Sequence, residues 1–265
     1  MNILETKHLT RRFGHLVAVD EINISVQEGE IFGLLGPNGA GKTTTLKMLT
    51  TLLPPTSGTA LVAGFDIVHQ ARSVRRRIGY VPQLLSADGA LTGYENLLMF
   101  AKLYDIKGKE REQRIQQSLK LMRLEDASLK LVNTYSGGMI RRLEIAQSML
   151  HRPPILFLDE PTIGLDPLAR SSVWEHIRQL KSNYGTTIIL TTHYMEEADS
   201  LCSRVAIMHE GRIAVIGTPS ELKASLGGED VTLDEVFAHY AGTELELGGS
   251  FREISRTRRT ARRLG

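Results

Sequence analysis

The chain has 265 residues, of which 42% are hydrophobic and 23% are charged, and these ordinary globular fractions exclude collagen, a continuous coiled coil and global disorder. Lys and Arg total 32 against 30 Asp and Glu, for a net charge of +2, so the overall charge gives no argument for nucleic-acid binding. The single cysteine, Cys202, fits a reducing compartment, and no apolar stretch reaches the roughly 18 residues that span a bilayer, so a soluble or peripheral protein is expected.

Strand signals dominate the N-terminal part of the chain. Apolar residues alternate with polar ones over residues 22–26, and residues 31–35 form a continuous apolar run. This run leads into a glycine-rich segment and then a helix, which should end by Leu53 because two prolines follow. Further strands are expected at residues 59–65 and over residues 78–83.

Helical spacing replaces the strand pattern between about residues 91 and 150. Beyond that segment, short apolar strands alternate with helices, and a hairpin turns at Glu210-Gly211. The strands are expected at residues 155–158 and 187–190, the helices at 168–180 and 195–202, and the hairpin strands at 204–209 and 212–217. Strands that alternate with helices predict an α/β fold with a mainly parallel sheet.

The glycine-rich segment at residues 36–43 matches the phosphate-loop pattern G-x-x-x-x-G-K-[ST], between a strand and a helix. Its glycines let backbone N–H groups converge on a polyphosphate, and the helix N-terminus adds positive potential. Lys42 can bridge the outer phosphates, and the Thr43 hydroxyl can bind Mg²⁺. The alternative, a glycine turn before a surface helix, does not explain the whole match in this context.

Two carboxylates, Asp159 and Glu160, follow the buried strand expected at residues 155–158. Ligands of open parallel sheets bind at the carboxyl ends of the strands. Asp159 can therefore hold Mg²⁺, through a water, and Glu160 can accept the proton of an attacking water. An acidic strand-to-loop turn is the simpler alternative, and the pairing with the phosphate loop argues against it.

A second candidate anion site precedes the helical run at residues 140–150. Ser136 is placed to cap that helix, and Gly137 and Gly138 leave N–H groups open to an anion. These residues alone do not relate the second site to the phosphate loop.

Taken together, the motifs resemble the ATP-binding subunit of an ATP-binding cassette (ABC) transporter. That family has a phosphate loop, a glutamine, a Ser-Gly-Gly signature, an Asp-Glu strand and a histidine, and this chain has them in the same order over about residues 2–220. Met139 stands where the commonest signature has glutamine. The residues around it and residues 232–237 resemble the daunorubicin/doxorubicin resistance-type (ABC-2) exporter ATPases.

The resemblance implies the site residues. Phe13 would stack on adenine, Asp166 would cross a dimer interface, and His193 would hold the γ-phosphate and orient the water. The implied catalytic residues are Glu160, His193 and Gln83, and the implied metal-binding residues are Thr43, Gln83 and Asp159. The implied ATP-binding residues are Phe13, Gly36, Asn38, Gly39, Gly41, Lys42, Thr43, Thr44, Ser136, Gly137, Gly138 and Asp166.

The resemblance also implies the architecture, a P-loop NTPase with a mainly parallel sheet core, an antiparallel β subdomain and an inserted helical subdomain. An ATPase domain is expected at residues 1–220, with the helical subdomain at about 84–150. A C-terminal extension would follow at residues 221–249, and a basic tail at residues 250–265. That tail has six arginines and one acid. It is solvated by default, with anionic lipid as an alternative partner; nucleic acid lacks support because no aromatic residues are interleaved.

The implied function is ATP hydrolysis, with Mg²⁺, that energises a separate transmembrane exporter subunit at the cytoplasmic face of the cell membrane. Two copies would form a homodimer around ATP, and the cargo would be a drug or another hydrophobic or lipid-like molecule. Residues 84–98 are a candidate docking surface for the membrane subunit, although their helical apolar spacing fits a core equally well. A soluble ABC ATPase that acts on ribosomes or DNA is the second hypothesis. A phosphate-loop kinase or GTPase is the third, and it leaves the signature and His193 unexplained.

Overall fold

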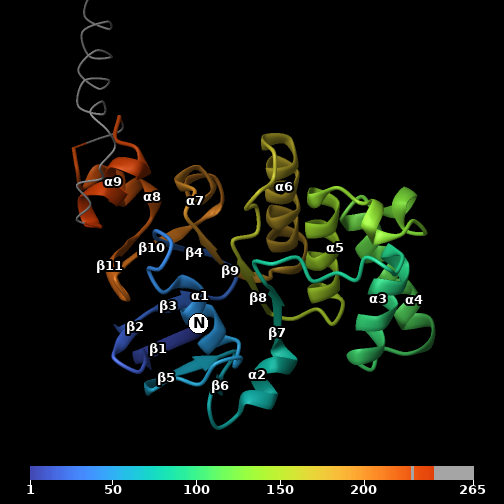
Figure 1. Ribbon diagram of the computed structural model, residues 1–265, viewed down its shortest axis with the longest axis horizontal. Helices are drawn as coiled ribbons and strands as arrows, with labels where there is room; N and C mark the ends of the chain where they lie inside the picture. Colours follow the sequence, from blue (N-terminus) through green and yellow to red (C-terminus); the bar gives the residue numbers. More distant parts are fainter. Residues whose placement is uncertain (228–229, 242–265) are drawn as a thin grey trace, which may run out of the picture.

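The computed structural model describes residues 1–227 and 230–241, which form two sheets and the helices around them (Figure 1). The central sheet has six strands in the order β11-β10-β4-β9-β8-β7, and every neighbouring pair is parallel except the hairpin of β10 and β11. Its strands are β4 (Ile31–Leu35), β7 (Ile78–Val81), β8 (Ile155–Asp159), β9 (Thr187–Thr192), β10 (Arg204–His209) and β11 (Arg212–Gly217). The mainly parallel α/β core predicted from the sequence is confirmed.

The second sheet is antiparallel and lies beside the central one, below it in Figure 1. Its strands are β1 (Asn2–Phe13), β2 (Leu16–Ile22), β3 (Ser25–Gln27), β5 (Ser57–Val62) and β6 (Phe65–Asp66). The single strand expected at residues 59–65 is wrong, because Ala63 and Gly64 take left-handed conformations, with φ of 50° and 82°, and turn the chain into the β5–β6 hairpin.

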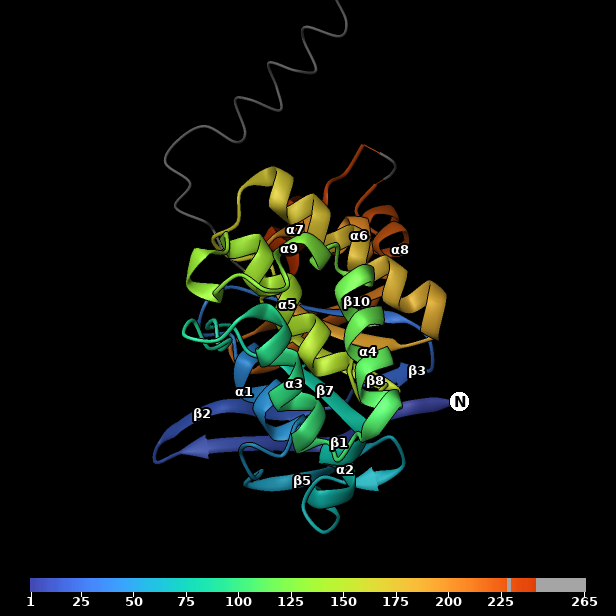
Figure 2. The ribbon, with the colours of Figure 1, turned by 90° about the vertical axis from the view of Figure 1, so that its right-hand side faces the viewer.

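A helical segment lies between β7 and β8, as predicted, and projects from one end of the sheets in Figures 1 and 2. It contains α3 (Gly93–Leu103), α4 (Gly108–Leu121) and α5 (Gly137–Met149), with single 3₁₀ turns at Glu125–Ala127 and Val132–Thr134. Within it Leu97 is fully buried, whereas Leu84 and Leu85 are 82% and 51% exposed. The core interpretation therefore holds for the helical positions, and the exposed part of the candidate docking segment is its beginning.

The remaining helices cover the faces and edges of the sheets. They are α1 (Lys42–Leu49), α2 (Ala71–Arg77), α6 (Pro167–Tyr184), α7 (Met195–Leu201), α8 (Pro219–Ala224) and α9 (Leu233–Tyr240). α9 packs against α7 and α8, and α8 spans residue 220, where the ATPase domain was expected to end. The basic tail expected at residues 250–265 lies outside the described residues.

Two apolar cores lie on opposite faces of the central sheet. On β4, Ile31 and Leu35 belong to one core and Phe32 and Leu34 to the other. Side chains alternate along a strand, so a strand between two cores must be apolar at every position. This explains the continuous apolar runs in the sequence and fixes the strand ends from which the phosphate loop and the carboxylates emerge.

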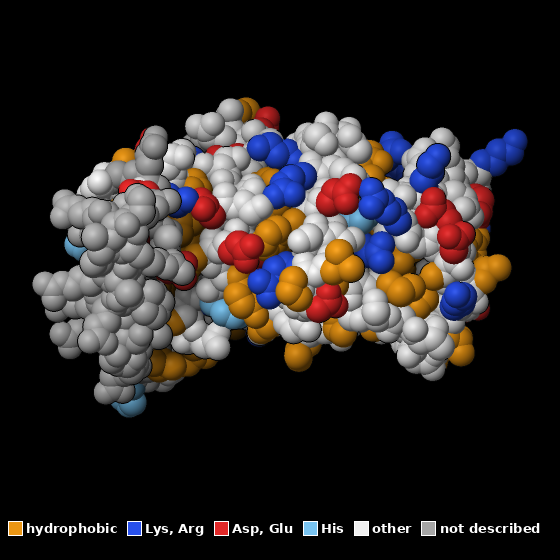
Figure 3. Space-filling model, turned by 90° about the horizontal axis from the view of Figure 1, so that it is seen from above, with side chains coloured by type: hydrophobic (Ala, Val, Ile, Leu, Met, Phe, Trp, Pro, Cys, Tyr) orange, Lys and Arg blue, Asp and Glu red, His pale blue; other side chains and the backbone are white. Residues whose placement is uncertain are grey.

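The face of the molecule seen from above mixes charges of both signs. Seen from above, Lys and Arg side chains alternate with Asp, Glu and apolar side chains on the part that grey atoms do not cover (Figure 3). Such a mixture is typical of a solvated face rather than of a nucleic-acid footprint. Within residues 1–227 and 230–241, every helix is too short or too polar to cross a membrane.

Candidate active site

The phosphate loop joins the end of β4 to the first turn of α1, in the context that the motif requires. Gly41 precedes the helix with φ of 104°, a conformation that L side chains rarely adopt. A Cβ on Gly36 would collide with the carbonyl oxygen of Met208, and one on Gly41 with that of Ala18. These two glycines therefore allow the loop to pass close to β10 and β2.

Asp159 ends β8 beside the start of α1. The Thr43 hydroxyl donates to its Oδ1 at 3.0 Å, and the Thr191 hydroxyl, from β9, donates to the same oxygen at 2.6 Å. Asp159 is 1% exposed. Burial of Tyr80, on the neighbouring strand β7, raises the pKa of its phenol to about 12, and the charge of Asp159 adds a smaller rise. Tyr80 is therefore a neutral phenol at neutral pH.

Glu160 is held between a lysine and a histidine. Lys42 Nζ lies 3.2 Å from Glu160 Oε1, and His193 Nδ1 lies 2.8 Å from Glu160 Oε2. Lys42 Nζ also donates to the carbonyl oxygens of Gly36 and Pro37 at 2.8 and 3.1 Å. Lys42 and Glu160 are 4% and 5% exposed in their side chains. Three residues that lie far apart in the sequence thus form one cluster at the carboxyl ends of β4, β8 and β9, in which Lys42 and Glu160 are buried and His193 is partly exposed.

The backbone of Glu160 is also constrained. Its φ of 48° is in the left-handed region, and its N–H donates to the Thr191 hydroxyl at 3.0 Å. Conformations of this kind are kept only where surrounding contacts hold them, and they are frequent at functional sites. Thr191, which binds the Asp159 carboxylate and the Glu160 backbone, was not among the predicted residues; its place at the end of β9, two residues before His193, was the available signal.

The signature and Asp166 lie together, away from this cluster. Ser136 caps α5 by accepting from the N–H of Met139 at 3.3 Å, and Asp166 caps α6 by accepting from the N–H of Ala169 at 2.9 Å. Gly138 packs so closely that a Cβ there would lie 2.9 Å from Cβ of Ala169. Among the described residues, no hydrogen bond or ion pair joins residues 136–138 or Asp166 to Lys42, Asp159 or Glu160.

Phe13 and Gln83 occupy the remaining predicted positions. The Phe13 side chain, at the end of β1, is 45% exposed, and the Arg11 guanidinium lies 4.5 Å from its ring centroid. A half-exposed ring can stack a base on its free face. Gln83 follows β7, and its carbonyl oxygen accepts from Arg141 Nη2 at 2.8 Å.

The donor set fits Mg²⁺. The ion is normally held by one or two carboxylates together with substrate phosphates and waters, rather than by an all-protein cage. Thr43 and Asp159 offer a hydroxyl and a carboxylate 3.0 Å apart beside the phosphate loop. The described residues contain no group of three His, Cys, Asp or Glu that could hold a metal ion by themselves.

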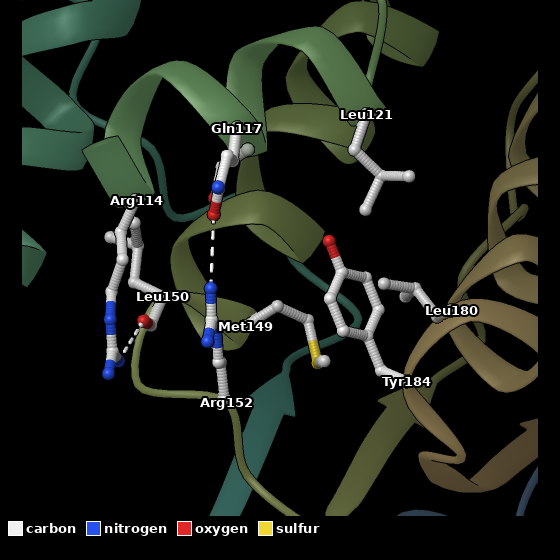
Figure 4. A pocket seen from close by; sticks show the side chains of 9 residues that line it. Arg114, Gln117, Leu121, Met149, Leu150, Arg152, Leu180 and Tyr184 are labelled. Atoms are coloured by element: carbon white, nitrogen blue, oxygen red, sulfur yellow. Dashed lines mark hydrogen bonds between the residues drawn. The ribbon is translucent and has the colours of Figure 1, made fainter. Parts of the chain in front are cut away.

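A small hollow in the surface lies between α4, α5 and α6 (Figure 4). It has a volume of about 30 Å³, enough for a water or two and not for a nucleotide. Its arginines are already engaged, Arg114 with the carbonyl oxygen of Leu150 at 2.8 Å and Arg152 with Gln117 at 3.0 Å. The phosphate loop is therefore the stronger candidate for substrate binding.

Glu197, on α7, links the segment after β8 to α6 through hydrogen bonds. It is fully buried, and its Oε1 accepts from the Thr162 hydroxyl and from Trp174 Nε1, both at 2.8 Å. Burial raises the pKa of the Glu197 carboxyl, against the smaller lowering effect of its hydrogen bonds and of Arg170. Glu197 was also not among the predicted residues. The sequence alone does not distinguish it from its neighbour Glu196, which is exposed.

Replacing Glu197 separates its hydrogen bonds from its charge. We expect Glu197→Ala to lower the free energy of unfolding by about 2–4 kcal/mol, because two buried donors lose their acceptor. Glu197→Gln keeps that acceptor and should be tolerated. In the unfolded parent protein, the Glu197 carboxyl ionises as the pH rises above about 4.5, whereas in the folded protein it stays protonated to a higher pH. The free energy of unfolding of the parent therefore falls as the pH rises through this range. The stability of the Gln variant relative to the parent should therefore grow as the pH rises above about 4.5.

The measurement is urea unfolding across this pH range, with Glu196→Gln as the exposed control. Equal losses in Glu197→Gln and Glu197→Ala would mean that the native carboxyl is ionised.

Known proteins resemble this chain in sequence and in fold. A family model described as ABC transporter matches residues 19–163. The daunorubicin/doxorubicin resistance ATP-binding protein of Streptomyces peucetius is 46% identical over 87% of this chain and 69% of its own length. A solved structure of an ATP-binding subunit of an ABC transporter covers 90% of this chain and 99% of its own, with a TM-score of 0.79 and 30% identity. A dimeric ATP-binding cassette, in a post-hydrolysis state bound to ADP and Pi, covers 81% and 98%, with a TM-score of 0.73 and 26% identity.

Proposed function

The chain belongs to the ABC transporter family, and we propose that it is the ATP-hydrolysing subunit of an exporter for a drug or another hydrophobic molecule. The observation that supports hydrolysis is the cluster of Lys42, Glu160 and His193 beside the Thr43–Asp159 pair. Export of a drug-like cargo is supported by the similarity to a drug-resistance ATP-binding protein. The peripheral position at the cytoplasmic face of the membrane follows from the same proposal.

The proposed binding roles follow from the geometry of the loop. Lys42 and the loop N–H groups bind the phosphates of ATP, and the free face of Phe13 stacks on the adenine. The other loop residues proposed to line the phosphates are Gly36, Asn38, Gly39, Gly41 and Thr44. Thr43 and Asp159, with Gln83, hold Mg²⁺, which when bound neutralises charge on the phosphates.

In the proposed hydrolysis step, Glu160 accepts the proton of the attacking water. Its Oε2 is within hydrogen-bond distance of His193, so the histidine fixes the direction in which the carboxylate points and lies where a γ-phosphate would be held. The hydrogen bonds that Asp159 accepts from Thr43 and Thr191 hold its carboxylate at the proposed Mg²⁺ site. The two neighbouring carboxylates therefore have different roles.

A second copy of the chain is part of the proposal. Ser136 and Gly137 are exposed at the N-terminus of α5, a helix of 13 residues, and a helix N-terminus of this kind favours an anion. Among the described residues, no hydrogen bond or ion pair joins them to the phosphate loop of the same chain, so a γ-phosphate held by another copy is their proposed ligand. The dimeric cassette with ADP and Pi supports this arrangement.

The proposed membrane subunit docks at the loop after Gln83. Leu84 and Leu85 are exposed there, next to a residue proposed to touch the metal or the water, so a partner that covers them can influence the site. A soluble ABC ATPase that acts on ribosomes or DNA would share the hydrolytic site and lack this partner.

The test is a pull-down of tagged Glu160→Gln protein with Mg-ATP from detergent-solubilised membranes, analysed by mass spectrometry. We expect a polytopic membrane protein without an ATPase domain, recovered less well by a Leu84→Ser, Leu85→Ser form. Recovery of ribosomal or DNA-bound proteins, with no membrane protein, would contradict export and leave the ATPase assignment standing.

A further inference from the structure

Helix α5, which begins at the signature, has three buried polar residues on one face. Arg141, Glu144 and Gln147 follow one another at three-residue intervals and are 2%, 3% and 2% exposed. Residues three apart lie on the same side of a helix, and buried charged side chains are rare unless they are paired. Their partners therefore indicate what this face of the helix holds in place.

Arg141 binds the backbone around Gln83. Its Nη1 donates to the carbonyl oxygen of Pro82 at 2.7 Å, and its Nη2 donates to that of Gln83 at 2.8 Å. The rigid fork of a guanidinium can satisfy two such acceptors at once. One side chain of α5 thus fixes two consecutive peptide groups at the end of β7.

Glu144 binds the same loop further along. Its Oε1 accepts from the N–H and hydroxyl of Ser86 and from the N–H of Ala87, and its Oε2 accepts from Arg141 Nη1 at 3.0 Å. The buried ion pair therefore spans both ends of the segment 82–87. Leu84 and Leu85, between the two fixed ends, are the exposed large apolar residues of this segment.

Gln147 extends the contact to a third point. Its Nε2 donates to Asn96 Oδ1 at 3.2 Å, and Asn96 exchanges two hydrogen bonds with the backbone of Asp88, at 3.0 and 2.9 Å. Such networks are costly when partly satisfied and rigid when complete. The loop from residue 82 to residue 88 is thus attached to α5 along two turns of the helix.

We propose that Arg141 and Glu144 are positioning residues that make the loop 82–88 and the signature helix one rigid unit. Because α5 runs without interruption from Gly137 to Met149, any displacement of Leu84 and Leu85 by a docked partner moves the N-terminus of the helix with it. The ion pair thereby couples the partner surface to residues 136–138 at the second nucleotide-binding surface. The consequence for ATP hydrolysis rests on the proposed function; the mechanical coupling does not.

The first test is hydrogen exchange on the nucleotide-free protein. Arg141→Met removes the guanidinium and keeps a long apolar stem. We expect exchange at residues 83–88 and at residues 137–140 to accelerate together, by at least tenfold. Arg142→Met is the matched control on the same helix, because Arg142 donates to the carbonyl oxygens of Met122 and Arg123 instead. It should leave exchange at residues 83–88 unchanged.

The second test separates positioning from stability. In Arg141→Met/Glu144→Leu no unpaired charge is left buried, so the melting temperature should recover much of what Arg141→Met loses. The kcat for ATP hydrolysis should stay at least tenfold below that of the parent protein. The affinity of the double variant for ATP should stay within threefold of the parental affinity. Recovery of kcat together with stability would overturn the proposal, as would parental exchange at residues 83–88 in Arg141→Met. A parent protein that does not hydrolyse ATP would instead contradict the proposed function and leave the exchange result valid.

Discussion

We expect Glu160→Gln to lower the rate of ATP hydrolysis by about a thousandfold, the middle of the range for loss of a general base, while ATP binding persists. The substitution keeps the shape and the hydrogen bond to His193 and removes the ability to accept a proton from water. The effect is measured as phosphate release in a single turnover, beside an equilibrium measurement of ATP affinity. Glu196→Gln, which changes an exposed carboxylate on α7, should hydrolyse ATP at the parental rate.

The same variant reports on the second copy of the chain. Because bound ATP is no longer consumed, Glu160→Gln should run as a dimer with Mg-ATP and as a monomer without it, as followed by light scattering on a sizing column. Ser136→Arg in the same background places a bulky cation at the exposed cap of α5 and should abolish the dimer. A Glu160→Gln protein that binds ATP and stays monomeric would contradict the two-copy site.

Local sequence patterns were sufficient for most of the fold. Continuous apolar runs identified β4, β8 and β9 because these strands are buried on both faces, and the phosphate-loop pattern placed Lys42 and Thr43 at the start of α1. The strand expected at residues 59–65 failed because its turn has Ala63 at a positive φ, a position at which glycine or asparagine is the usual signal.

The ordered motifs pointed to candidate site residues, but not to their contacts. The pairing of Lys42 with Glu160, 118 positions apart in the sequence, follows from the adjacency of β4, β9 and β8, which no local pattern reports. Arg141 and Glu144 were part of the string used for the resemblance, and nothing in their spacing distinguished a buried pair from an exposed i,i+3 pair on a helix surface. Supporting residues such as Thr191 depend on long-range packing in the same way.

Lys42→Met should weaken ATP binding by about a hundredfold, because each charge-assisted hydrogen bond to phosphate contributes about 1.5–3 kcal/mol. It should also destabilise the nucleotide-free protein by about 3–5 kcal/mol, the usual result of leaving one partner of a buried ion pair without the other. Isothermal titration and urea unfolding measure the two effects separately. Lys47→Met, on the exposed side of α1, is the control for both.

The double variant Lys42→Met/Glu160→Gln tests the coupling between the two charges. Stability should return toward that of the parent, with a coupling free energy of about 2 kcal/mol or more, whereas ATP affinity should remain low. Strictly additive losses of stability would mean that the pair is not formed in solution.

One ammonium group serves two anions in this site, Glu160 and the phosphates that Lys42 is proposed to bind. ATP must therefore compete with a carboxylate 3.2 Å from Lys42 Nζ, and Glu160→Gln, which removes the competing charge, should bind ATP more tightly than the parent. An unchanged or weaker ATP affinity in Glu160→Gln would contradict this competition between the carboxylate and the phosphates for Lys42.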